Sequence, residues 1–342
     1  DEIVPASDFD SAVEKSAQKL AATSDRPSEG KGIVLEPLKR RSTPDHLAYC
    51  AVDLTISRDV GVATLTISGP QSPPPTDLAE LINSGSAFWP LSTARELDDA
   101  ILYLRFNEPE IGVLKFASHG DLSRVLSYDQ FLEQNSDHWL CREIRLYWKR
   151  VLKRLDVTSR SMISVIEPGS CFAGTLAEIL FACDRSYMLS GMPEGTNIPP
   201  ASILLTSVNF GAYPMSNGLT RLETRFLGQP ELLKGAEIRI DAPLLGDECE
   251  SMGLVTFAFD DIDWDDEIRI FLEGRTAFSP DAMIGMEANL RFAGPETMET
   301  KIFSRLSAWQ NWIFQRPNAV GPKGALKRYG SGQKGEFNRE RV

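Results

Sequence analysis

The chain has 342 residues, of which 42% are hydrophobic and 25% charged, a globular composition with room for two hydrophobic cores. Its 48 acidic residues outnumber 36 basic ones, and the net charge of −12 argues against broad binding to nucleic acid or an anionic membrane. The five cysteines are scattered, which favours reduced thiols in the cytoplasm and offers no zinc site. No apolar run reaches the roughly 20 residues that span a bilayer.

Two segments about 250 residues apart resemble each other, and the first lacks its beginning. Residues 3–10, IVPASDFD, and residues 255–263, VTFAFDDID, each run into an amphipathic pattern typical of a helix. We therefore expect residues 1–24 to be the C-terminal end of a first domain. The rest of that domain is expected to be missing from this sequence.

The following regions are predicted in chain order. A helix over residues 8–24 carries Phe9, Val13 and Leu20 on one face. Residues 25–45, rich in Ser, Pro, Gly and charge, form a linker. Residues 46–259 form a second unit. Its predicted elements are strands at 48–56, 60–67, 111–117 and 162–166, a loop at 68–75, and helices at 94–106 and 139–155.

The first two strands alternate apolar and polar residues, which favours an antiparallel pair. The later alternation of strands and helices predicts a parallel sheet covered by helices. Strand patterns end at residue 260. A helical region over 260–320 is predicted, with helices at 263–274, 280–291 and 295–314, and an extended tail follows over 321–342.

The candidate site lies where a buried strand at 162–166 turns into a helix that begins near Gly174. Backbone N–H groups at such a helix start can bind a developing oxyanion, and Glu178 lies one turn further on as a possible acid or base. The alternative interpretation is tight helix-on-sheet packing, with Glu178 as a buried, hydrogen-bonded carboxylate.

These residues resemble the crotonase (enoyl-CoA hydratase/isomerase) superfamily. The carrying motifs are GSCFAGTLAEILFACD at 169–184, HGDL at 119–122, NFGAYP at 209–214 and GLV at 253–255. The resemblance implies an α/β fold: a crotonase-like (ββα spiral) domain followed by a C-terminal helical region. It also implies that Glu178 is an acid/base residue, and that Gly120 and the pair Gly174–Thr175 belong to the two oxyanion-binding segments.

Sequence motifs in the C-terminal region further resemble those of lyases of this superfamily that act on an aromatic CoA thioester. They include SPDA at 279–282, MEANLRF at 286–292 and AWQNWIF at 308–314. The implied reaction opens an epoxidised benzoyl-CoA ring with water, giving formate and a semialdehyde CoA ester. The implied partners are the acyl-CoA substrate, the missing N-terminal unit and further copies in a homo-oligomer. No metal or redox cofactor is implied, and neither nucleic acid nor membrane.

Three departures from the superfamily pattern concern the site. Ser207 stands where a second glutamate is expected, and a serine hydroxyl cannot serve as a resting base. Thr175 replaces a glycine, and the loop at His119 is short. We therefore expect a degenerate second unit, with the complete glutamate pair in the missing first unit and an inactive isolated fragment.

Other hypotheses remain open. The unit could be a non-catalytic scaffold or dimerisation half, a site that binds CoA without chemistry, or a generic enoyl-CoA hydratase-like enzyme. Structural roles are expected for His119 and for the basic face over residues 142–154. Trp309, Trp312 and Phe314 are expected to pack between helices, with the C-terminal helices as an alternative cover for the active site.

Overall fold

The computed structural model describes residues 2–26, 30, 32–192, 195 and 197–341. The chain divides into two units, Asp1–Glu36 and Pro37–Val342. Part of the predicted linker, residues 27–29 and 31, lies outside the described residues. The second unit starts ahead of the predicted residue 46, because residues 41–43 already pair as a strand of its sheet.

The first unit contains the helix predicted over residues 8–24. A 3-10 turn, Ala6–Asp8, leads into α1, Phe9–Ala22. Among the described residues, α1 has no buried side chain, and both Phe9 and Val13 are more than half exposed. The amphipathic pattern of this helix therefore has no apolar partner within its own unit.

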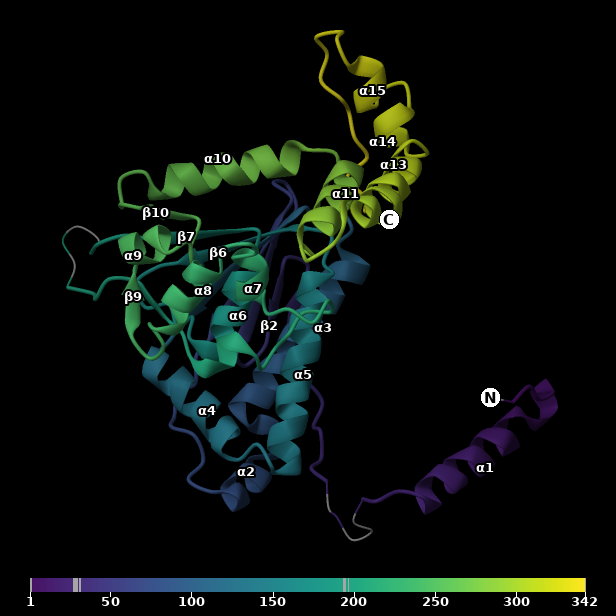
Figure 1. The fold of residues 1–342 in the computed structure, drawn as a ribbon, viewed down its shortest axis with the longest axis vertical. Coiled ribbons are helices and arrows are strands. Elements are labelled where there is room, and N and C mark those ends of the chain that lie inside the picture. The colour runs from purple at the N-terminus through teal and green to yellow at the C-terminus, as the bar shows by residue number, and fades with distance from the viewer. Residues whose placement is uncertain (1, 27–29, 31, 193–194, 196, 342) are drawn as a thin grey trace. The chain divides into compact units, whose positions relative to one another are not determined.

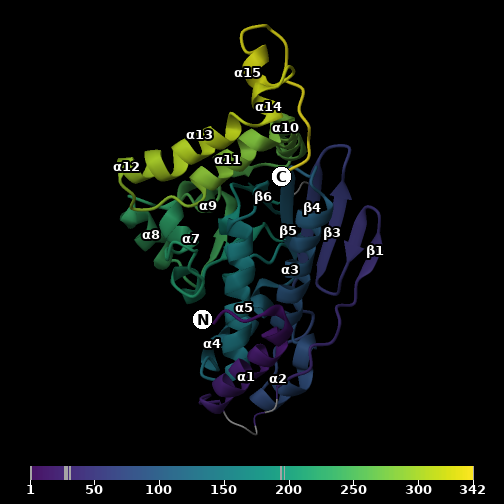
Figure 2. The same cartoon turned by 90° about the vertical axis from the view of Figure 1, so that its right-hand side faces the viewer.

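An eight-stranded sheet forms the centre of the described second unit, in the order β1-β2-β3-β4-β5-β6-β7-β10 (Figures 1 and 2). The strands are β1 (Arg41–Thr43), β2 (His46–Ala48), β3 (Val52–Ser57), β4 (Val62–Ser68), β5 (Val113–His119), β6 (Ser161–Ile166), β7 (Arg185–Leu189) and β10 (Phe257–Phe259). The pairs from β1 to β4 are antiparallel, and those from β4 to β10 are parallel. The predicted antiparallel pair and parallel sheet are both confirmed.

The prediction of one strand over residues 48–56 is wrong at its start. The chain turns between β2 and β3, where the N–H groups of Ala51 and Val52 both donate to Glu96 Oε2, at 2.7 and 3.1 Å. A carboxylate that takes two adjacent backbone donors prevents them from continuing a strand ladder. Glu96 lies 45 residues after Ala51 in the sequence, so local periodicity could not reveal this break between β2 and β3.

Helices cover one face of the sheet (Figures 1 and 2). The larger ones are α3 (Trp89–Asn107), α4 (Leu122–Gln134), α5 (Trp139–Asp156) and α6 (Gly174–Ala182). The smaller elements are α2 (Leu78–Ser84), α7 (Arg221–Arg225), α8 (Pro230–Glu237), α9 (Gly246–Ser251) and the antiparallel pair of β8 (Ser202–Leu204) with β9 (Pro243–Leu245). Helix α3 begins before the predicted residue 94, because Pro90 occupies its first turn, where no backbone donor is needed.

On the opposite face, α10 (Trp264–Ala277) lies over β6, β7 and β10. Its side chains Trp264 and Ile268 are buried in one apolar cluster with the strand residues Val165, Tyr187 and Leu189. Phe257 and Phe259 of β10 pack against the same cluster. Phe271 and Leu272 extend this packing, and Arg275 donates to Ser161 of β6 at 3.1 Å, so contacts to the sheet run along most of α10.

The C-terminal helices follow α10, as the sequence predicts. They are α11 (Pro280–Leu290), α12 (Met298–Thr300), a π-helical turn (Lys301–Leu306), α13 (Ser307–Ile313), α14 (Pro317–Val320) and α15 (Ala325–Arg328). Beyond the end of α11, Arg291 pairs with Asp184 at 2.8 Å, next to β7. The predicted packing is confirmed for Trp309, which packs edge-on against Trp312 and close to Gly285 of α11, whereas Phe314 is 52% exposed.

The prediction of an extended tail over residues 321–342 is wrong where α15 forms. Glu336 folds this segment back on itself through ion pairs with Lys323 at 2.6 Å and Arg328 at 2.9 Å. In the sequence, these charged residues indicate a solvated, disordered segment. Their pairing is not visible there, because the paired residues are separated by a turn.

Two isoleucines of α10 test how this helix is held. Replacing buried Ile268 with alanine should lower the free energy of unfolding by about 2–4 kcal/mol, through lost burial and a cavity in the cluster. Ile270, in the same helix but 56% exposed, is the matched control, and Ile270→Ala should change stability by less than about 0.5 kcal/mol. Urea denaturation of both variants measures this. Equal losses would contradict the packing.

Candidate functional site

The predicted site is built around the turn from β6 into α6. All six residues of β6 are buried, so the strand holds the following turn rigidly against the helices. Gly174 opens α6 with a φ of 45°, and a Cβ at this position would overlap with Asp129 Oδ2. A glycine is therefore required both by the backbone conformation and by the close approach of α4.

The N–H group of Thr175, one predicted oxyanion donor, is already engaged. It donates to Asp129 Oδ2 at 2.7 Å, and the Thr175 hydroxyl donates to Asp129 Oδ1 at 2.7 Å. Asp129 lies on α4 and is buried, and this burial raises the pKa of Asp129 to about 6. A carboxylate of the protein thus takes the donor that a substrate oxygen would need.

The N–H group of Gly120, the other predicted donor, is also engaged. It donates to the carbonyl oxygen of Gly169 at 2.9 Å, so the loop after β5 is joined to the turn after β6. Gly120 has a φ of 149°, and a Cβ there would lie 2.9 Å from the Cα of Gly69. Close backbone packing explains the glycine without a ligand.

Glu178 lies at the centre of a buried polar network. Its side chain is 1% exposed, accepts a hydrogen bond from Asn209 Nδ2 at 2.8 Å, and pairs with Arg221 Nη1 at 2.8 Å. Arg221 also pairs with buried Asp156 at 2.7 Å. Burial raises the pKa of Glu178, and the positive charge of Arg221 opposes this rise.

Ser207, the residue at the expected second glutamate, lies in the 3-10 turn Ser207–Phe210. Its hydroxyl donates to the carboxylate of Glu133 at 3.2 Å. Glu133 belongs to α4, so the same helix supplies a carboxylate beside both Thr175 and Ser207. Sequence reasoning missed Asp129 and Glu133, because α4 itself was not predicted.

Arg221, Asn209 and Asp156 were also missed. They come from three separate segments, and Arg221 lies 43 residues beyond Glu178, so no local motif joins them. One local signal was present for Asn209. Thr206 and Asn209 form a capping box, with Val208 N–H donating to Thr206 Oγ1 and Thr206 N–H donating to Asn209 Oδ1.

The histidine beside the predicted oxyanion loop has a partner within the protein. The imidazole Nε2 of His119 lies 3.2 Å from the hydroxyl of Ser68, at the end of the neighbouring strand. His119 also lines a cavity of about 1130 Å³. None of Gly174, Thr175 and Glu178 lines this cavity, so the predicted site residues are packed inside the protein rather than around an open space.

Among the described residues, no group of three or more His, Cys, Asp and Glu side chains is arranged to hold a metal ion. None of the helices formed by these residues is both long and apolar enough to cross a membrane. Four cysteines are buried and Cys50 is exposed, and all five are free thiols.

Solved structures with this arrangement of sheet and helices include enoyl-CoA hydratases. The enzyme from Geobacillus kaustophilus aligns with a TM-score of 0.58 and 15% identity, covering 89% of this chain and 100% of its own. An enoyl-CoA hydratase/isomerase from Cupriavidus metallidurans aligns with a TM-score of 0.56 and 17% identity, covering 85% and 97%. This likeness establishes the crotonase fold.

The sequence comparison is more specific. No family model matches the chain. The benzoyl-CoA-dihydrodiol lyase of Aromatoleum evansii is 46% identical over all 342 residues, and the chain spans 61% of the length of that relative. The fold and the full-length match agree with each other and with the resemblance seen in the sequence. The chain is therefore a crotonase-fold relative of benzoyl-CoA-dihydrodiol lyase.

Proposed function

We propose that this chain is the C-terminal part of a lyase that opens the ring of 2,3-epoxybenzoyl-CoA with water. The products would be formate and a semialdehyde CoA ester. The observation that carries this proposal is the 46% identity to a benzoyl-CoA-dihydrodiol lyase over the whole of this chain. The cytoplasmic location suggested by the five free thiols belongs to the same proposal.

Within that lyase, we propose that the second unit is a structural partner without reacting groups. An oxyanion site needs N–H donors that point at a substrate oxygen. Here the N–H of Thr175 is bound by Asp129, and that of Gly120 is bound by Gly169. An acid or base must also reach its substrate, whereas Glu178 is 1% exposed and held by Arg221.

The reacting carboxylates are accordingly proposed to lie in another crotonase unit, outside this chain. The comparison of α1 with α10 supports this. Both helices have 14 residues and follow an aspartate, and Phe9 and Val13 of α1 occupy the positions of Trp264 and Ile268 in α10. The α10 residues are buried on a sheet face, so the exposed α1 residues fit a second such face.

The C-terminal helices are proposed to cover that other unit or another copy of the chain. Several large apolar side chains of this region are more than half exposed: Met298, Phe303, Leu306 and Phe314. Exposed apolar side chains gathered over one region commonly mark a contact surface. The generic enoyl-CoA hydratase alternative lacks such an observation, since the solved hydratases share only 12–17% identity with the chain.

Calorimetry with benzoyl-CoA tests whether this unit binds substrate. Titration of millimolar benzoyl-CoA into the 342-residue chain should release no binding heat, because the two oxyanion donors are engaged internally. The complete lyase of Aromatoleum evansii is the positive control. Saturable heat with this chain would contradict a purely structural unit while leaving the lyase assignment intact.

Glu178→Gln tests the role of the buried carboxylate. The variant should lower the free energy of unfolding by about 3 kcal/mol, because it removes one partner of a buried ion pair. Glu143→Gln, on the exposed face of α5, should leave stability unchanged within about 0.5 kcal/mol. In the complete protein, turnover per folded molecule should not change with Glu178→Gln. A specific loss of turnover with normal folding would assign Glu178 to catalysis.

Asp129 should make stability fall as the pH rises. Its pKa in the folded protein is raised from the ordinary 3.8 to about 6, so the folded state holds a proton that the unfolded state releases. This contribution is complete below pH 3.8 and is lost as the pH rises through about 6, a loss of about 2–3 kcal/mol. Denaturation at several pH values should show a flatter profile for Asp129→Asn. Parallel profiles would contradict this.

A further inference from the structure

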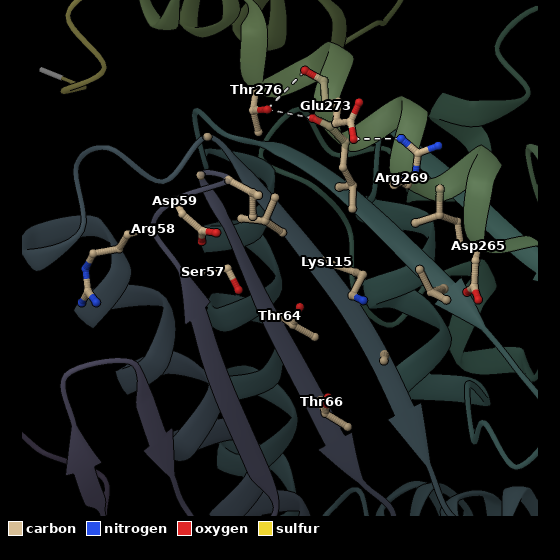
Figure 3. A pocket seen from close by; sticks show the side chains of 18 of the residues that line it. Ser57, Arg58, Asp59, Thr64, Thr66, Lys115, Asp265, Arg269, Glu273 and Thr276 are labelled. Carbon is tan, nitrogen blue, oxygen red and sulfur yellow. Dashed lines mark hydrogen bonds and ion pairs between the residues drawn. The ribbon is translucent and has the colours of Figure 1, made fainter.

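A large cavity that the Glu178 network does not use lies on the sheet face away from α3, α5 and α6. Helix α10 covers this face over β6, β7 and β10, and a cavity of about 1130 Å³ remains beside it, over β4 and β5 (Figure 3). That volume is slightly above the range of about 300–1,000 Å³ that is typical of small-molecule sites. The cavity is separate from the Glu178 network described above.

Polar side chains form the floor of this cavity. Thr64 and Thr66 of β4 and Lys115 of β5 rise from the same face, and Thr64 is the register partner of Lys115 (Figure 3). Because side chains alternate along a strand, the neighbours of these residues point to the opposite, helix-covered face, where Leu65 and Leu114 are buried. A lysine on the half-buried face of a central strand has few neighbouring groups with which its ammonium group can form a hydrogen bond or an ion pair.

The charges around the cavity leave Lys115 as an unpaired cation. Arg58 pairs with Glu108 at 2.5 Å, and Arg269 pairs with Glu273 at 3.0 Å. The two tail arginines at the rim are committed to backbone carbonyls: Arg339 to Thr276 and Phe278, and Arg341 to Pro109 and Glu110. Within the described part of the chain, the ammonium group of Lys115 has neither a hydrogen bond nor an ion pair.

The apolar part of the lining lies on the side next to α10. Ile268 and Leu272 line the cavity there, between the charged residues Asp265, Arg269 and Glu273 of the same helix, and Val165 and Ala117 add apolar surface from the sheet. The site therefore offers an apolar strip beside α10, next to one cation and two hydroxyl groups of the sheet. A dianionic phosphate would need more donors than this floor supplies, whereas one amine with nearby hydroxyls matches a single carboxylate.

We propose that this cavity binds a small monocarboxylate with a flat apolar body. The carboxylate pairs with Lys115 and accepts from Thr64 or Thr66, and the body lies against Ile268 and Leu272. The carboxylates of Asp59 and Asp265 stand at the edges of the cavity and would repel the acid from those ends (Figure 3). Glu110, Glu167 and Glu273 also line the cavity; Glu167 accepts from Trp264 at 2.9 Å and Glu273 pairs with Arg269 at 3.0 Å, so Lys115 remains available to the anionic group of the ligand.

Benzoate is the probe for this site. In a saturation-transfer NMR titration of the 342-residue chain, Lys115→Met should weaken benzoate binding about tenfold or more, because a charge-assisted hydrogen bond is lost. Lys234→Met, at an exposed position on α8, is the matched control and should leave the dissociation constant unchanged. Benzamide, which has the same shape without the charge, should bind at least about tenfold more weakly than benzoate.

A second variant keeps the test decisive if Lys115→Met misfolds. Ala117→Phe leaves Lys115 in place, fills the floor and should abolish benzoate binding, with folding checked by circular dichroism. Benzoate that fails to bind the unaltered chain saturably, or that binds Lys115→Met and the unaltered chain equally, would overturn the proposal. Equal affinity for benzoate and benzamide would also overturn it, because the carboxylate would then contribute nothing.

Discussion

The buried guanidinium of Arg221 is the interaction on which the helical layer depends. It pairs with Asp156 at the end of α5 and with Glu178 in α6, and it donates to the carbonyl of Tyr213 at 3.0 Å. With 2% exposure on its own side chain, it is shielded from solvent and its partners cannot be replaced by water. These contacts join three segments of the chain. They also engage the carboxylate of Glu178, to which the crotonase pattern assigns the role of an acid or base.

Much of the fold was predictable, because it is encoded over short distances in the sequence. Alternating residues in β3 and β4 indicated an antiparallel pair, and the mostly apolar sequence of β6 indicated a strand buried on both faces. Helix α4 was not predicted, although its buried residues Val125, Tyr128 and Leu132 lie at helical spacing. The helix begins after Asp121, whose side chain accepts a hydrogen bond from the Ser123 N–H group as an N-cap. This cap is recognised only once the helix itself is known.

The candidate site was predictable only in part, for the same reason. Gly174, Thr175 and Glu178 are neighbours in the sequence, and the family motif identifies them together. Their partners are not neighbours: Asp129 is 46 residues before Thr175, and Arg221 is 43 residues after Glu178. A motif can show that a residue type is retained, but whether its polar atoms are free depends on distant segments. The residues Ser207 and Thr175 and the short loop at His119 were the local signs that this site departs from the family pattern.

The hydrogen bond from the Thr175 N–H group to Asp129 also affects how easily an oxyanion site could form at this helix start. Removing the Asp129 side chain would leave the Thr175 N–H buried and unpaired, at a cost of about 1–3 kcal/mol, before any substrate could benefit from it. The Gly120 donor would have to be released from Gly169 in a separate step. Each step alone lowers stability without restoring activity. Freeing both N–H groups for a substrate oxygen would therefore take at least two separate changes to this chain, one at Asp129 and one at the contact with Gly169.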